Sequence, residues 1–168
     1  FGNWTYNNIT DYDSDGCLDG DWYGLSEIIS LNDATRVDAM VSDSDGRIYI
    51  AGLYRNGLTL GNHTLTPQSQ SAAFVARLGL NGTWDWAVDM DNTTTNDPIN
   101  LDIDSSGNAY FTGRHPQRGS SGVEFTWNGT QYWKTTSDSY AFVAKVNSDG
   151  SEGYLQRFLN GNDFKIDA

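Results

Sequence analysis

Residues 43–52 read DSDGRIYIAG, and residues 104–113 read DSSGNAYFTG. Both stretches place an Asp-x-x-Gly turn before a run of apolar and aromatic residues that ends in a second glycine. A matching pair follows in the same order, AFVARLGLNG at residues 73–82 and AFVAKVNSDG at residues 141–150. A self-similar period of about sixty residues is typical of a propeller or another repeat array.

Each copy of the repeat is expected to form four β-strands. Apolar and polar residues alternate in the first strand of each copy, as they do in a half-buried strand. Asn-Gly and Asp-Gly favour two-residue hairpin turns because both central residues can take positive φ. The strands are expected, in chain order, at residues 37–41, 48–50, 57–60 and 73–76 in the first copy and at 99–103, 110–111, 122–125 and 141–144 in the second.

The sequence therefore predicts an all-β fold with two copies of an antiparallel, four-stranded, blade-like repeat. Such a fold is either an incomplete propeller or a β-repeat array. The expected organisation is an N-terminal segment with an acidic loop (1–31), a first β repeat (32–98), a second β repeat (99–161) and the first strand of a further repeat (162–168).

Charge and composition narrow the classes of function. The chain carries 22 acidic and 10 basic residues, so its formal net charge is −12. A nucleic-acid partner is not expected, because phosphate backbones are bound by clusters of Lys and Arg. No apolar stretch reaches the roughly 18 residues of a membrane helix, so membrane insertion is not expected either. Phe1 is not an initiator Met, which favours a processed chain or a fragment, and Cys17 is the only cysteine.

Six Asn-x-Thr sequons indicate the compartment. Each is a potential acceptor of an N-linked glycan in a surface loop. A chain rich in Asn and Thr also collects sequons by chance, and that alternative stays open. The pattern favours an extracellular or cell-surface glycoprotein, in which Asn62 and Asn128 should lie in exposed turns. The six acceptors are Asn3, Asn8, Asn62, Asn81, Asn92 and Asn128.

One acidic loop resembles a calcium site. Residues 11–19 read DYDSDGCLD, and alternating carboxylates with Gly at the sixth place match the first half of an EF-hand-type loop. Trp22 stands where such a loop has its bidentate Glu. A plain acidic turn is therefore an equal alternative to a Ca²⁺ site. The expected ligands are Asp11, Asp13, Asp15, the backbone carbonyl of Cys17, and Asp19.

The repeat motifs resemble a known family. The pattern Asp-x-x-Gly-Asn-x-Tyr-x-Thr-Gly at residues 104–113, followed by Ala-Phe-Val-Ala-Lys at 141–145, is similar to the seven-bladed β-propeller repeat of bacterial and archaeal surface proteins. The resemblance covers residues 32–168. It implies blade-like sheets in a non-enzymatic extracellular protein and transfers no catalytic residues. Two blades depart from the family pattern, because a closed ring uses at least four.

The last residues of the sequence resemble the beginning of a repeat, since KIDA at 165–168 matches RVDA at 36–39. Phe164, Ile166 and Ala168 alternate with polar residues, and we expect them to form a donor strand that pairs with a second copy. A head-to-tail contact that does not close produces a filament. The expected function is an extracellular structural glycoprotein that assembles with itself by strand exchange into a filament or surface layer. The alternative is a fragment of a ligand-binding or adhesive propeller.

No catalytic function is expected from the sequence. His63 and His115 have no partner at zinc-ligand spacing, and the sequence contains no Gly-x-Ser-x-Gly elbow or phosphate loop. Several aromatic residues could stack on a carbohydrate partner, although packing in the core or along one strand face is the commoner use. These aromatic residues are Trp84, Trp86, Trp127, Tyr132 and Trp133.

Overall fold

The computed structural model describes residues 35–67, 71–90, 100–115, 122–134 and 140–159. The chain divides into two compact units, Phe1–Ser30 and Leu31–Ala168, and every described residue belongs to the second unit. The described residues contain twelve β-strands and no helix. None of these elements is a helix that could span a membrane.

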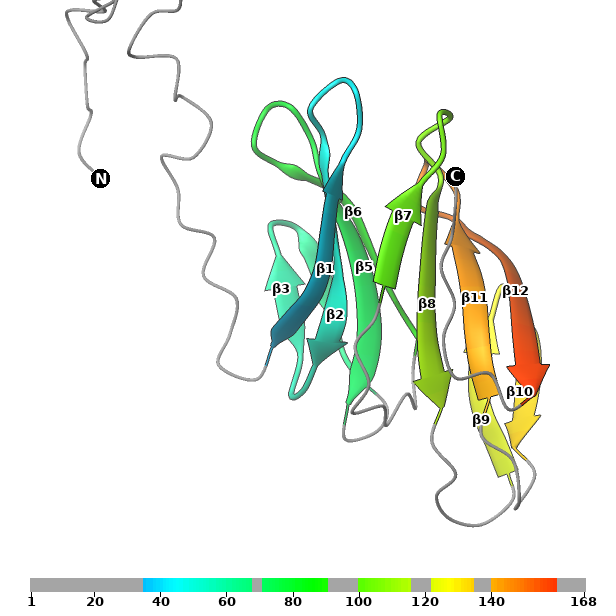
Figure 1. The fold of residues 1–168 in the computed structure, drawn as a ribbon. Coiled ribbons are helices and arrows are strands. Elements are labelled where there is room, and N and C mark those ends of the chain that lie inside the picture. Colours follow the sequence, from blue (N-terminus) through cyan, green and yellow to red (C-terminus); the bar gives the residue numbers. More distant parts are fainter. Residues whose placement is uncertain (1–34, 68–70, 91–99, 116–121, 135–139, 160–168) are drawn as a thin grey trace, which may run out of the picture. The chain divides into compact units, whose positions relative to one another are not determined.

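Two four-stranded antiparallel sheets of the same topology form the described fold (Figure 1). The first sheet has the order β1-β2-β5-β6, and the second has the order β7-β8-β11-β12. In each sheet a separate two-stranded hairpin, β3–β4 or β9–β10, lies in the chain between the second and third strands. The strands are β1 (Arg36–Ser42), β2 (Ile48–Tyr54), β3 (Leu58–Leu60), β4 (His63–Leu65), β5 (Ala72–Leu78), β6 (Trp84–Met90), β7 (Asn100–Ile103), β8 (Ala109–His115), β9 (Gly122–Trp127), β10 (Thr130–Lys134), β11 (Tyr140–Val146) and β12 (Glu152–Leu159).

The predicted all-β fold with four-stranded antiparallel sheets is confirmed, but the third and fourth strands were assigned wrongly. The segments at 57–60 and 122–125 pair only within the hairpins β3–β4 and β9–β10. The two Ala-Phe-Val-Ala segments are the third strands of the sheets, and β6 and β12 are the fourth. The reason is local: Gly61-Asn62 and Asn128-Gly129 form two-residue turns that fold each segment back on its own neighbour.

Four hairpin turns of one type connect the paired strands of the sheets, at residues 43–46, 79–82, 104–107 and 147–150. In each turn the glycine amide donates to the carbonyl three residues earlier, at 2.8–3.1 Å. Only the glycine has positive φ, between 74° and 94°. This is a type I turn followed by a left-handed glycine. The expectation of two positive φ values is wrong for these four turns, but it holds for Asn128-Gly129, at 46° and 69°, and for Asn56-Gly57, at 61° and 107°.

The first strands of the two sheets pair in the same register, but their apolar residues are offset by one position. Val41 pairs with Tyr49, whose equivalent in the second sheet is Tyr110, but Tyr110 pairs with Asp102 and not with Ile103. A shift of one residue turns a side chain to the opposite face of a sheet. The predicted equivalence of the two alternating first strands is therefore wrong, and their apolar residues lie on opposite faces of their sheets.

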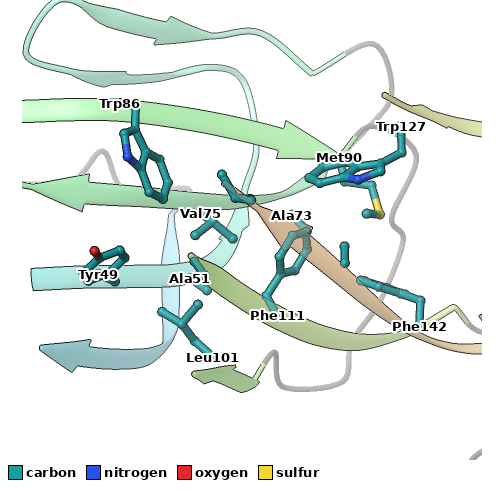
Figure 2. Packing of buried hydrophobic residues seen from close by; sticks show 13 residues of the cluster. Tyr49, Ala51, Ala73, Val75, Trp86, Met90, Leu101, Phe111, Trp127 and Phe142 are labelled. Carbon is teal, nitrogen blue, oxygen red and sulfur yellow. The ribbon is translucent and has the colours of Figure 1, made fainter. Parts of the chain in front are cut away.

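The two faces of each sheet have different partners. We call the face of the first sheet that carries Tyr49, Val75 and Trp86 its front face, and the opposite face, which carries Phe74 and contacts the β3–β4 hairpin, its back face. In the second sheet, the back face carries Phe111 and the front face carries the residues that alternate with it. The front face of the first sheet packs on the back face of the second in one continuous core (Figure 2).

Aromatic side chains form the centre of this core. Phe111 lies edge-on to both Trp127 and Phe142, with ring centroids 5.6 and 5.7 Å apart. All three side chains are at most 2% exposed. Aromatic pairs in this geometry stabilise a core beyond the area that they bury. The interface between the two sheets is thus the main hydrophobic core of the described residues.

Candidate functional site

The turns of both sheets meet at one end of the described fold, which we call the turn end. The turn at 43–46 and the turn at 104–107 together line a cavity of about 650 Å³, to which Arg77 and Ser148 also contribute. The lining is mostly polar and contains both carboxylates and guanidinium groups. This cavity is the main candidate for a ligand site in the described residues.

Two equivalent aspartates in this cavity organise their own turns. The Asp43 carboxylate accepts hydrogen bonds from the amides of Asp45 and Arg47, at 3.0 and 2.9 Å, and from the Tyr49 hydroxyl at 3.4 Å. The Asp104 carboxylate accepts from the amides of the equivalent positions and from the Tyr110 hydroxyl at 3.0 Å. The Asp-x-x-Gly-x-x-Tyr spacing of the repeat is therefore a turn-closing motif.

The hydrogen bonds also shift the acidity of these groups. Burial raises the pKa of Asp104, but the hydrogen bonds from Asn108, Tyr110 and Ser106 together outweigh it and hold the pKa below its usual value. At Asp43, burial is likewise outweighed by hydrogen bonds and charge from Arg47 and by the Asp45 amide, so the pKa is lowered. Both carboxylates are ionised and engaged within the protein at neutral pH.

The cavity offers little to a metal ion. The third carboxylate, Asp45, pairs with Arg47 at 2.6 Å. Among the described residues no three His, Cys, Asp or Glu side chains come together as a metal site. The predicted Ca²⁺ ligands Asp11, Asp13, Asp15, Cys17 and Asp19 lie outside the described residues.

A second feature of the turn end is a set of hydrogen bonds that side chains of the first sheet donate to the turns of the second sheet. The Tyr49 hydroxyl lies 3.3 Å from the Gly107 carbonyl oxygen, so its single proton is shared between this carbonyl and the Asp43 carboxylate. Arg77 and the Trp86 indole both donate to the Ser148 carbonyl, at 2.8 and 3.3 Å. Tyr49, Arg77 and Trp86 form one cross-strand row on the front face of the first sheet. We call them the front row of the first sheet.

The guanidinium of Arg77 is fixed from several sides. It pairs with Asp85 at 2.9 Å and lies 5.9 Å and 5.6 Å from the ring centroids of Tyr49 and Trp86. Cation–π contacts of this kind are stronger where water is excluded. The front row is thus a preorganised set of donors, aimed at backbone carbonyls of the neighbouring sheet.

The second sheet carries the same row. Tyr110 pairs with Lys145, and Tyr154 lies beside them with its ring 6.3 Å from that of Tyr110. The Lys145 ammonium lies 6.0 Å from the Tyr110 ring centroid, and within the described part of the chain it forms no ion pair. We call these residues the front row of the second sheet. Tyr154 is 55% exposed, whereas its counterpart Trp86 is 5% exposed.

Three of the six sequons can be placed, and all three lie in exposed hairpin turns. Asn62 and Asn128 are in the two-residue turns of the hairpins β3–β4 and β9–β10, and Asn81 is in the turn between β5 and β6. The Asn81 side-chain carbonyl accepts hydrogen bonds from both the amide and the hydroxyl of Thr83. Asn3, Asn8 and Asn92 lie outside the described residues.

The predicted aromatic platform does not form as a single surface. Trp86 and Trp127 are buried, and the Trp127 indole donates to the Gly153 carbonyl at 3.1 Å. Trp84 and Trp86 were expected on one face of a strand, but an irregularity in the β5–β6 pairing turns them to opposite faces. Tyr132 is half-buried. The Trp133 side chain lies outside the described part of the structure.

His63 is half-buried in β4, with its Nε2 3.1 Å from the Trp84 carbonyl oxygen. The donor strand predicted for Phe164, Ile166 and Ala168 lies outside the described residues.

The front row of the second sheet was not singled out from the sequence. A signal was present, because Tyr follows the turn glycine by three residues in both copies and a basic residue follows Ala-Phe-Val-Ala in both.

Comparison with known protein families, with curated proteins and with solved structures finds no significant match to this chain.

Proposed function

We propose that the chain is an extracellular structural glycoprotein that assembles head to tail with further copies of itself. The observation that carries this proposal is the front-to-back packing of its two sheets, in which the front face of one sheet contacts the back face of the other. Because the two faces of this contact differ, it can be repeated from copy to copy without closing. Contacts of that kind generate rings or open filaments.

The sequons support the extracellular part of the proposal. Asn62, Asn81 and Asn128 are all exposed in turns, where a bulky glycan can be carried without disturbing a sheet. The resemblance to propeller repeats of bacterial and archaeal surface proteins agrees with a non-enzymatic surface role. The predicted donor strand at Phe164–Ala168 and the predicted Ca²⁺ loop at residues 11–19 belong to the same proposal as contributors to assembly and to stiffness.

Two measurements on natively produced protein test this function. Mass spectrometry of glycopeptides should find N-linked glycans on Asn62, Asn81 and Asn128. Light scattering should find particles of many copies whose mass grows with protein concentration. Sequons that are all unmodified would contradict the extracellular glycoprotein, and a particle that remains a monomer or a single closed ring would contradict the polymer.

One observation favours a second candidate, an adhesive or ligand-binding role. The cavity at the turn end has the size and polarity of a site for a small polar ligand such as a sugar. Most of its charged groups already bind one another, as Asp43, Asp45 and Arg47 show. Binding of a glycan array probe that is abolished by Ser105→Trp, which would fill the cavity, would favour this role over the structural one.

A further inference from the structure

The contact between the two sheets of one chain provides a template for a contact between two chains. Its front side is the row Tyr49, Arg77 and Trp86, and its opposite side consists of backbone carbonyls in the turns of the second sheet. The Cβ and Cγ atoms of Trp86 lie 2.7 Å from the position that a Cβ on Gly150 would occupy, so the turn and the ring are in close contact. The template thus combines three directed hydrogen bonds with close packing.

Each side of this template occurs a second time in the chain. The front row of the second sheet, Tyr110, Lys145 and Tyr154, repeats the donors. The turns of the first sheet repeat the acceptors, because Gly46 is equivalent to Gly107 and Leu80 is equivalent to Ser148. The front row of the second sheet and the turns of the first sheet therefore have the chemistry of a matched pair.

The exposed apolar side chains lie on the same two surfaces. Among the described residues, five large apolar side chains are exposed: Val37, Met40, Leu80, Tyr154 and Phe158.

Three of these exposed residues belong to the first sheet. Val37 and Met40 pair with Gly52 and Ile50 and so lie on its back face, and Leu80 lies in its turn end. The other two, Tyr154 and Phe158, lie on the front face of the second sheet along β12. Single exposed apolar residues are common on protein surfaces, and these five matter here because they lie on the two surfaces that repeat the internal contact.

Residues at equivalent positions of the two sheets differ in their exposure to solvent. Leu101 is 8% exposed because it packs in the core between the sheets, whereas its equivalent in the first sheet, Met40, is 68% exposed. On the front faces, Trp86 is buried in the internal contact, whereas its equivalent Tyr154 is exposed. Among the described residues, no four-stranded sheet packs on the second sheet's front face or on the first sheet's back face, where the β3–β4 hairpin leaves Met40 exposed.

We propose that the Tyr110–Lys145–Tyr154 row of one copy binds the turn end and back face of the first sheet of a second copy. The inference rests on the proposed function, since it names the surfaces that would join head to tail. In this joint, Lys145 donates to the Leu80 carbonyl of the second copy. The Tyr110 hydroxyl shares its proton between Asp104 and the Gly46 carbonyl of the second copy, as Tyr49 shares its proton between Asp43 and Gly107. The Tyr154 ring packs on the Leu80 side chain. Asp43, Asp45 and Arg47 of that turn end together carry one net negative charge, which faces Lys145.

The joint is tested by placing one lesion on each of its two sides in the full chain. Tyr154→Asp removes one side, and Leu80→Asp removes the other. Both side chains are mostly exposed, so both variants should fold as the wild type does. Each is expected to weaken self-association by about 30-fold or more, the size of a hot-spot loss. Asn56→Asp adds the same charge at an exposed position beyond β2 and should leave association unchanged.

A mixture of the two variants gives the deciding result. The Leu80→Asp copy keeps an intact front row, and the Tyr154→Asp copy keeps an intact turn end, so one good joint can form. Sedimentation velocity should find heterodimers in the mixture, with neither variant growing further alone. Met40→Asp, a second lesion on the side of Leu80, should complement Tyr154→Asp in the same way but should not complement Leu80→Asp.

Two other outcomes separate the joint from the proposed function. If the wild type assembles and both variants assemble equally well, these surfaces are not the joint, although the protein still polymerises. If the wild type stays monomeric at every concentration, both the joint and the proposed polymer are wrong. Loss of folding in Leu80→Asp, detected by circular dichroism, transfers the test of that side to Met40→Asp.

Discussion

The packing of the 147–150 turn against the Trp86 ring gives a direct test of how the two sheets fit together. Gly82 and Gly150 occupy equivalent positions in equivalent turns, with φ of 75° and 85°. A Cβ on Gly82 would meet no atom within 4 Å, whereas a Cβ on Gly150 would lie 2.7 Å from two atoms of Trp86. The two Gly→Ala substitutions therefore share the backbone strain and differ only in the clash.

The expected magnitudes follow from these two effects. Alanine in the left-handed region costs about 1–2 kcal/mol, so Gly82→Ala should lower the free energy of unfolding by that amount. Overpacking costs about 1–3 kcal/mol more, so Gly150→Ala should be more destabilising than Gly82→Ala by that margin. A difference of 1 kcal/mol corresponds to roughly 3–6 °C in melting temperature for a domain of this size.

Urea unfolding followed by tryptophan fluorescence measures both variants under the same conditions. The slopes of the two transitions should match that of the wild type, since neither substitution changes the surface exposed on unfolding. Equal losses in the two variants would refute the packing of the 147–150 turn on Trp86 and with it the template for the proposed joint.

Three further predictions concern the core, the turns and the acidic loop. Phe111→Ala should lower the free energy of unfolding by about 3–5 kcal/mol, because Phe111 is 1% exposed between Trp127 and Phe142; a loss below 1 kcal/mol in urea unfolding would exclude it from the core. The lowered pKa values of Asp43 and Asp104 stabilise the fold above the unfolded-state pKa of about 4, so stability should fall as pH drops through the lower folded-state values, and Asp104→Asn should flatten this dependence in unfolding curves between pH 7 and 2. Calcium added to chelator-stripped protein should bind at residues 11–19 and raise the melting temperature; calorimetry without a binding signal would leave the loop an acidic turn.

The repeat made much of the fold predictable. The segments after the Asp-x-x-Gly turns and the Ala-Phe-Val-Ala segments are short apolar runs, and both were correctly predicted as strands, although the second was given the wrong place in the sheet. The fourth strands were missed because β6 and β12 mix charged and aromatic residues, and irregular pairing breaks their alternation. Turn type was missed because Asp-Gly and Asn-Gly fit both a two-residue turn and a type I turn with a following glycine.

The one-residue offset between the apolar residues of the two first strands could have been derived from their spacing to the turn. Val41 precedes its turn aspartate by two residues and Ile103 precedes its own by one, which places the two side chains on opposite faces. The front row of the second sheet was harder to find, because its meaning depends on a contact formed only by its counterpart in the first sheet. Exposure of Tyr154 and burial of Trp86 are properties of the packed sheets, and no local pattern encodes them.

Cross-linking between two differently labelled copies tests the head-to-tail claim most directly. Full chains carry Cys17→Ser together with either Leu80→Cys or Tyr154→Cys, and a short bis-maleimide is added to each variant and to their mixture. We expect dimers only in the mixture, joined between positions 80 and 154 as identified by mass spectrometry. Dimers in either variant alone would indicate a symmetric contact, and a mixture without an 80–154 cross-link would contradict the head-to-tail joint.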